Sequence, residues 1–205
     1  MTSDLRQGAD KACRVSQPAD PRVRRTRKLL EDAFRALIKQ KSFAALSVRD
    51  ITDYATVNRA TFYAHYTDKH DLATSVLRND LRHSMFGRFQ ERPTFTSENL
   101  VEMATMLFEF LQAINSACPN TESELSGTVE NALNEEFCDI IEHWLGVDKS
   151  YVRLFPGCSK STVATVISCS IYGGALRWVR SPKSEREPAS HICREIVSML
   201  LPPSR

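Results

Sequence analysis

The chain has 205 residues, enough for one large domain or two small ones, each with a core of its own. With 42% hydrophobic and 25% charged residues, it has the composition of an ordinary globular protein. The net charge of +2 hides an asymmetry, because residues 1–92 hold 18 Lys and Arg against 11 Asp and Glu, and residues 93–205 hold 9 against 14. Unless this split is a chance one, it predicts a basic module that meets a polyanion, joined to an acidic module with another task.

The start of the chain and its apolar stretches disfavour secreted and membrane proteins. Residues 1–14 contain five charged residues and no apolar segment, so we expect no secretory signal and a cytoplasmic location. The longest uncharged stretch, residues 161–176, has 16 residues, fewer than the roughly 20 that a membrane span needs. It indicates a buried helix instead.

Six cysteines are spread widely, with no CxxC pair and no Cys and His spacing typical of a metal site. No nucleophile and base constellation or cofactor motif occurs either, so we expect no metal, no cofactor and no enzyme. The cysteines are most simply core or surface residues of a reducing compartment. A redox-sensing role for one of them stays open, because reactivity depends on exposure and on the thiol pKa.

The chain opens with a polar segment and a basic helix. Residues 1–20 show no periodicity and are expected to form a disordered tail. Residues 22–40 carry apolar side chains at spacings of three and four, and Pro21 stands where a helix can begin, so the pattern predicts a helix. Its start is densely basic, with Arg22, Arg24, Arg25, Arg27 and Lys28.

Short helices are expected to follow, because residues 22–86 contain neither glycine nor proline. Ser47 with Asp50 resembles a capping box and predicts a helix over residues 48–55. Asp68 with Asp71 repeats the pattern and predicts a long helix over residues 69–88.

Four more helices are expected in the second half, at residues 97–117, 123–146, 160–181 and 188–201, separated by segments with Pro, Gly, Asn or Asp. Residues 151–155 are ambiguous between strand and helix, and no strand pattern is convincing elsewhere. The pattern therefore predicts an all-α fold.

Residues 57–66 are the candidate for the second helix of a helix-turn-helix motif, the helix that enters the DNA major groove. On helical spacing, Phe62 and Tyr66 share a face and are expected to pack with Val57 on a core made by Phe34, Leu37, Leu46 and Ile51. The opposite face then presents Arg59, Ala60 and Tyr63, with Asn58 and Thr61 at its edges.

These residue types suit DNA. Arg59 can bind guanine O6 and N7, Asn58 can pair with adenine or cap the helix, and the Ala60 methyl group can touch a thymine methyl group. We therefore predict base contacts from these three residues. Phosphate contacts are expected from Thr61, Tyr63, His65 and Lys69, the last of which opens a helix whose dipole favours an anion.

Residues 23–84 closely resemble the tetracycline-repressor-like (TetR) family of bacterial transcription regulators. The resemblance is carried by residues 29–34, Phe43, residues 47–51 and above all by the run Thr-Phe-Tyr-x-His-Tyr-x-x-Lys at 61–69. It implies a three-helix DNA-binding domain at 21–86, with the helix-turn-helix motif at about 47–66, and phosphate contacts from Ser47 and Arg49. Thr56 departs from the pattern, since many members have a turn glycine there; the turn must avoid positive φ or accept strain.

The resemblance also implies that residues 87–205 form a helical bundle that binds a small molecule and makes a homodimer. We expect the dimer to use residues 160–181 and 188–201. In the first segment, Ile167, Ile171, Gly174 and Trp178 form one stripe, and Gly173 with Gly174 allows close approach; in the second, the apolar residues are Ile192, Ile196, Val197 and Leu200. The alternative is that both helices complete a monomeric core.

Candidate effector-pocket residues in this half are large and apolar, although each of them also suits a plain core: Met103, Leu107, Phe108, Phe110, Phe137, Trp144 and Trp178. Together with these patterns, the resemblance implies a dimeric repressor that an effector releases from a palindromic operator, with two recognition helices about 34–36 Å apart. The alternative is a partner-controlled or architectural DNA-binding protein without a small-molecule ligand.

Overall fold

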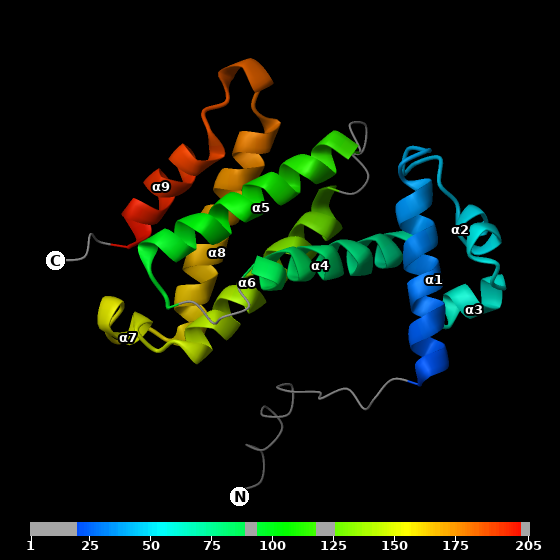
Figure 1. The fold of residues 1–205 in the computed structure, drawn as a ribbon, viewed down its shortest axis with the longest axis horizontal. Coiled ribbons are helices and arrows are strands. Elements are labelled where there is room, and N and C mark those ends of the chain that lie inside the picture. Colours follow the sequence, from blue (N-terminus) through cyan, green and yellow to red (C-terminus); the bar gives the residue numbers. More distant parts are fainter. Residues whose placement is uncertain (1–19, 89–93, 118–125, 202–205) are drawn as a thin grey trace, which may run out of the picture.

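The structure is a computed structural model that describes residues 20–88, 94–117 and 126–201. Within these ranges the regular secondary structure consists of helices and includes no strand, which confirms the all-α prediction (Figure 1). The expected tail at residues 1–20 lies outside the described residues except for Asp20, and so does the expected start of a helix at residue 123.

The N-terminal domain begins with helix α1 (Pro21–Leu37), which starts where a side chain caps it. The carboxylate of Asp20 accepts a hydrogen bond of 2.9 Å from the Arg22 N–H, and Pro21 occupies the first turn, where its missing N–H costs nothing. The helix ends three residues earlier than the sequence predicts. The carbonyl of Leu37 instead accepts from the N–H groups of Gln40 and Lys41 and closes a turn.

Helices α2 (Val48–Ala55), α3 (Arg59–Tyr63) and the first half of α4 (Lys69–Arg88) complete this domain around one core. The bounds of α2 and α4 agree with the sequence prediction. All core residues predicted around α3 are buried or half-buried, and burial of each large apolar side chain contributes about 1.5–3 kcal/mol. The largest members of this core are Leu30, Phe34, Phe43, Leu46, Ile51, Phe62, Tyr66 and Leu72.

A second core lies in the C-terminal half, where α5 (Ser97–Ala117), α6 (Ser126–Val147), α8 (Lys160–Arg180) and α9 (Ala189–Leu200) pack together. Helix α6 lies along α8, and α5 lies against both α8 and α9. Helix α4 runs from the first core to the second and joins the two halves (Figure 1).

Two short elements fall between the long helices. The ambiguous segment forms helix α7 (Tyr151–Leu154), and a single 3₁₀ turn, η1 (Lys183–Glu185), precedes α9. Among the described residues, no helix is both long and apolar enough to cross a membrane.

The stripe that we expected on the dimer face of α8 points into the protomer instead. Ile167 and Ile171 are 1% and 0% exposed, and a Cβ atom on Gly174 would lie 2.4 Å from Ile196 Cδ1 of α9. The close approach that this glycine permits is therefore used within one chain, and the prediction was wrong about the face. The exposed face of α8 carries a different stripe, made of Thr162, Val166, Ser170, Gly173 and Arg177.

Candidate nucleic-acid interface

Helix α2 begins with the capping box that the sequence predicts. The Ser47 hydroxyl oxygen accepts from the Asp50 N–H at 3.1 Å, and Asp50 Oδ2 accepts from the Ser47 N–H at 2.9 Å. Lys41 donates to the same carboxylate at 2.8 Å, and hydrogen bonds from Lys41 and Ser47 hold the pKa of Asp50 well below its usual range. Since the Ser47 O–H also donates to Asp50 at 2.6 Å, its proton is already used within the protein.

The turn between α2 and α3 accepts strain at Thr56. Its φ of 56° and ψ of 43° place it in the left-handed region, where no other non-glycine residue of the described chain has a positive φ. A β-branched residue in this conformation costs about 1–2 kcal/mol relative to glycine. The Val57 N–H donates to the Thr52 carbonyl at 3.0 Å and closes the turn.

Helix α3 is shorter than the predicted span of residues 57–66. Asn58 lies before it in extended backbone, and its side-chain oxygen accepts from the Ala60 N–H at 2.9 Å. Asn58 was considered for base contact and for helix capping, and in this structure it caps the helix. After Tyr63 the chain leaves the helix through a turn in which the N–H groups of His65 and Tyr66 both donate to the Phe62 carbonyl at 2.9 Å.

The two faces of α3 differ as the sequence predicts. Phe62 is 0% and Tyr66 2% exposed, and their ring centres lie 5.8 Å apart in the core. Arg59 and Ala60 are exposed, and so is Tyr63, at 51%. Thr61 and His65 are half-buried at the edges of this face. Buried aromatic rings thus hold a short helix whose outer face carries a guanidinium, a methyl group and a phenol.

Arg49 lies on the exposed side of α2, with 80% of its side chain accessible to solvent. Its guanidinium forms an ion pair with Asp53, one turn further along the helix, at 3.5 Å. An exposed pair of this kind is worth only a few tenths of a kcal/mol, so the guanidinium can exchange it for another anion at little cost.

Lys69, for which we expected a phosphate contact, is engaged within the protein in this structure. Its ammonium group donates to the carbonyls of Phe43, Ala44 and Leu46 at 3.0, 3.3 and 3.0 Å. An ammonium group has three N–H donors, and all three have acceptors within the protein. Lys69 therefore fastens the segment between α1 and α2 to the start of α4, and a phosphate contact requires it to give up one of these carbonyls.

The same combination of helices, turn and exposed residues is found in known proteins. Residues 30–76 match the family model described as bacterial regulatory proteins, tetR family. Over these residues the chain is similar to the TetR family.

Among similar proteins, the uncharacterized HTH-type transcriptional regulator YxbF of Bacillus subtilis is 38% identical over 60 residues, which are 29% of this chain and 16% of that protein. The HTH-type transcriptional repressor KstR2 of Rhodococcus jostii is 28% identical over 134 residues, 60% of this chain and 64% of the repressor. The matches thus span less than two thirds of either relative.

A solved structure extends the comparison to both halves of the chain. The fatty acid degradation regulator FadR of Bacillus halodurans has a TM-score of 0.57 and 19% identity to this chain, and the match covers 87% of this chain and 99% of that one. At this identity the similarity concerns the fold.

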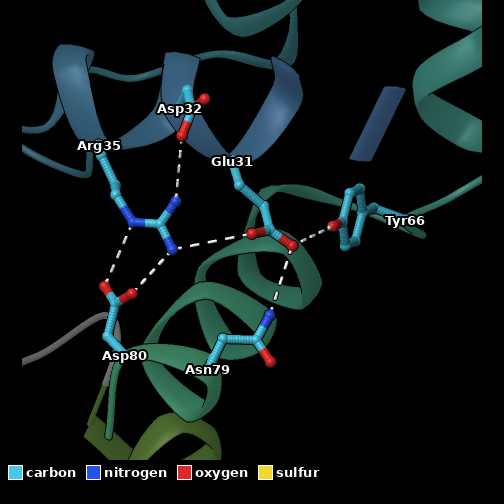
Figure 2. A network of polar contacts seen from close by, with 6 residues as sticks. All are labelled: Glu31, Asp32, Arg35, Tyr66, Asn79 and Asp80. Carbon is cyan, nitrogen blue, oxygen red and sulfur yellow. Dashed lines mark hydrogen bonds and ion pairs between the residues drawn. The ribbon is translucent and has the colours of Figure 1, made fainter. Parts of the chain in front are cut away.

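A network of polar side chains ties the end of α3 to α1 and α4 (Figure 2). Glu31 accepts from the Tyr66 hydroxyl at 3.2 Å and from the Asn79 amide at 3.4 Å, and Arg35 binds Asp80 with hydrogen bonds of 2.7 and 3.3 Å. Burial, with the nearby Glu31 charge, raises the pKa of Tyr66 to about 12. Spacing along the sequence gave no sign of this network, because its members lie far apart in the chain.

The second half of α4 is bound to α6 in turn. Arg78 donates to the Ala132 carbonyl at 3.1 Å, and Arg82 donates to Glu136 at 2.6 Å, where the Glu136 side chain is 5% exposed. One stretch of α4, residues 78–82, therefore makes polar contacts both with α1 and with α6.

The seven predicted pocket residues all belong to the bundle core or pack against it. Met103, Leu107, Phe108, Phe137 and Trp144 are buried, while Phe110 and Trp178 are partly buried. The Trp178 ring lies 5.6 Å from the Phe108 ring and its N–H donates to the Glu187 carbonyl. A shallow hollow lies elsewhere, on the exposed side of α8, lined by Gly173, Leu176, Arg177, Arg180 and Ser181.

Proposed function

We propose that the protein is a dimeric transcriptional repressor that reads an operator with α3 and leaves it when a small molecule binds the C-terminal bundle. The observation that carries this proposal is the exposed face of α3, with Arg59, Ala60 and Tyr63 held outward by buried Phe62 and Tyr66. A helix of five residues is about 7.5 Å long and fits across a major groove about 12 Å wide.

Base contacts are assigned to Arg59 and Ala60 and to the amide N–H₂ of Asn58, whose oxygen caps α3. Phosphate contacts are assigned to Arg49, Thr61, Tyr63 and His65, which surround that face with N–H and O–H donors. Ser47 joins them when its hydroxyl turns away from Asp50, as the family resemblance implies.

The domain boundary is placed near residue 86, within α4, so that residues 21–86 read DNA and residues 87–205 receive the signal. For the dimer we propose the exposed face of α8, in which Val166 is 51% exposed and a Cβ atom on Gly173 would meet no neighbour. On the neighbouring helix α9, Met199 is 77% exposed and offers a further apolar side chain to a partner. Two-fold symmetry then sets two α3 helices about one DNA turn apart.

The effector site is proposed among the seven predicted pocket residues of the bundle core. Since these side chains are packed together, a ligand must separate them, and their separation strains the contacts that α6 makes with α4. The ligand then favours an arrangement of α4 that does not fit the operator, by no more than its difference in affinity for the two states. Such a regulator works beside the chromosome, in the cytoplasm.

The experiment that tests the proposed function is selection of bound sites from random DNA with the full chain. We expect enrichment of one palindromic sequence whose half-sites are centred about one helical turn apart. Enrichment of no sequence would contradict the repressor, and enrichment of a single half-site would contradict the dimer. Thermal unfolding against a metabolite library, followed by release of the selected DNA, then identifies the effector, because a ligand stabilises the state that it binds.

A further inference from the structure

The first nine residues of α1 form a helical arm that has no place in the core. None of residues 21–29 is buried; the first buried residue of α1 is Leu30. At 1.5 Å per residue, this arm extends about 13 Å beyond the core of its own domain. A helix end that is not packed contributes little to folding, so its sequence is free to serve a partner.

The arm carries a high and unbalanced positive charge. Arg24, Arg25, Arg27 and Lys28 are all exposed. The basic residue of α1 that forms ion pairs is Arg35, which lies further along the helix. Among the described residues, no carboxylate forms an ion pair with Arg24, Arg25 or Lys28. Unpaired like charges repel one another and attract a polyanion.

The arm lies beside the proposed DNA-reading helix. The Arg27 guanidinium stands 5.4 Å from the centre of the Tyr66 ring, and the Tyr66 hydroxyl donates to Glu31 one turn further along α1. Tyr66 follows the last residue of α3 by three positions, so the arm stands at the C-terminal end of α3 (Figure 1).

The width of the major groove, compared with the length of α3, indicates that DNA phosphates lie near the arm. Helix α3 is about 7.5 Å long and the major groove about 12 Å wide, so groups just beyond either end of α3 face the walls of the groove, where the phosphates lie. The long side chains of arginine and lysine reach such a wall from a neighbouring helix. The arm is then a natural contact for the strand at the C-terminal end of α3.

On the basis of the proposed reading of DNA by α3, we infer that Arg24, Arg25 and Lys28 form a second DNA-binding surface that grips backbone phosphates. This surface recognises the charge of duplex DNA and carries no sequence information. It strengthens binding to every sequence alike and leaves the choice of operator to α3. Arg27 supports it by holding the arm against Tyr66.

The test compares two charge-matched variants of the full chain on a short duplex of mixed sequence. One variant carries Arg24→Gln, Arg25→Gln and Lys28→Gln; the control carries Lys39→Gln, Lys149→Gln and Lys183→Gln, at exposed positions away from the arm. Affinity is measured against salt concentration. Each phosphate contact that is lost makes the log–log slope shallower by about 0.9, so a dimer that loses three per protomer changes its slope by about 5.

We expect the arm variant to show this change, the control to keep the wild-type slope, and both to unfold at the wild-type temperature. Equal slopes for the two variants would overturn the inference. Vesicles of phosphatidylserine that bind the wild type and not the arm variant, with the DNA slope unchanged, would overturn it as well and assign the arm to a membrane. If the wild type itself fails to bind DNA, it is the proposed function that fails.

Discussion

The ammonium group of Lys69 donates a hydrogen bond of 3.0 Å to the carbonyl of Phe43 and lies 4.6 Å from the centre of the same residue's ring. Its other two donors bind the carbonyls of Ala44 and Leu46. One side chain from α4 thus fixes the loop that leads into α2, and with it the angle at which the helix-turn-helix motif leaves α1.

Replacing Lys69 with Met is expected to lower the free energy of unfolding of the DNA-binding domain by about 2–3 kcal/mol, because three carbonyl groups lose a charged donor. Thermal unfolding of the full chain measures this. Lys39→Met, at an exposed position, is the control and is expected to leave stability unchanged. Unchanged stability together with weaker DNA binding in Lys69→Met would show that the side chain serves DNA after all.

Thr56→Gly is expected to stabilise the domain by about 0.5–1 kcal/mol. Glycine relieves the left-handed strain of about 1–2 kcal/mol, and part of that gain is lost to the greater freedom of glycine in the unfolded chain. Thr56→Ala keeps a Cβ atom and is expected to bring no gain. The difference between the two variants in chemical denaturation isolates the backbone effect; equal stability would argue against strain at this turn.

The lowered pKa of Asp50 predicts that part of the free energy of unfolding depends on pH. Its pKa is lowered in the folded protein by hydrogen bonds from Lys41 and Ser47, so its contribution is present above the unfolded value of about 3.8 and is lost as the pH falls below it. Asp50→Asn is expected to unfold more easily than the wild type near neutral pH. This difference should shrink as the pH falls below about 4, and a difference that stays constant with pH would contradict the capping role.

The two neighbouring glycines of α8 predict different effects on replacement by alanine. A Cβ atom on Gly174 meets the Cδ1 end of Ile196 and forces that side chain to turn, so the lost packing offsets the helix propensity of about 1 kcal/mol that alanine gains, and Gly174→Ala is expected to be less stable than Gly173→Ala. Gly173 has open space around it, so Gly173→Ala gains helix propensity of about 1 kcal/mol within the protomer and weakens the proposed dimer. Unfolding and sedimentation together measure the two effects. Unaltered dimerisation of Gly173→Ala would move the interface to another face.

Local signals in the sequence predicted much of this fold. Ser47 with Asp50 and Asp68 with Asp71 are pairs three residues apart, and hydrogen bonds at such short range decide where a helix begins. The start of α2 and the full length of α4 were therefore predicted correctly. The burial of Phe62 and Tyr66 followed in the same way from their spacing of four residues.

Features that depend on distant contacts were not visible in the sequence. The three acceptors of Lys69 come from a loop more than twenty positions away, and a lysine beside a helix start looks the same whether it binds carbonyls or a phosphate. Similarly, a glycine on an apolar stripe indicates close helix packing and does not specify whether the neighbour is Ile196 of the same chain or a second copy. Only the tertiary structure decides between these alternatives.

The central claim, that α3 reads base edges, is tested most directly by the ratio of affinities for the selected operator and for random DNA, measured for the wild type and for Arg59→Ala at one salt concentration. We predict that Arg59→Ala lowers operator affinity by about 1–3 kcal/mol, or roughly 5- to 150-fold, with little change on random DNA. An equal loss on both DNAs would contradict a base-reading role for Arg59.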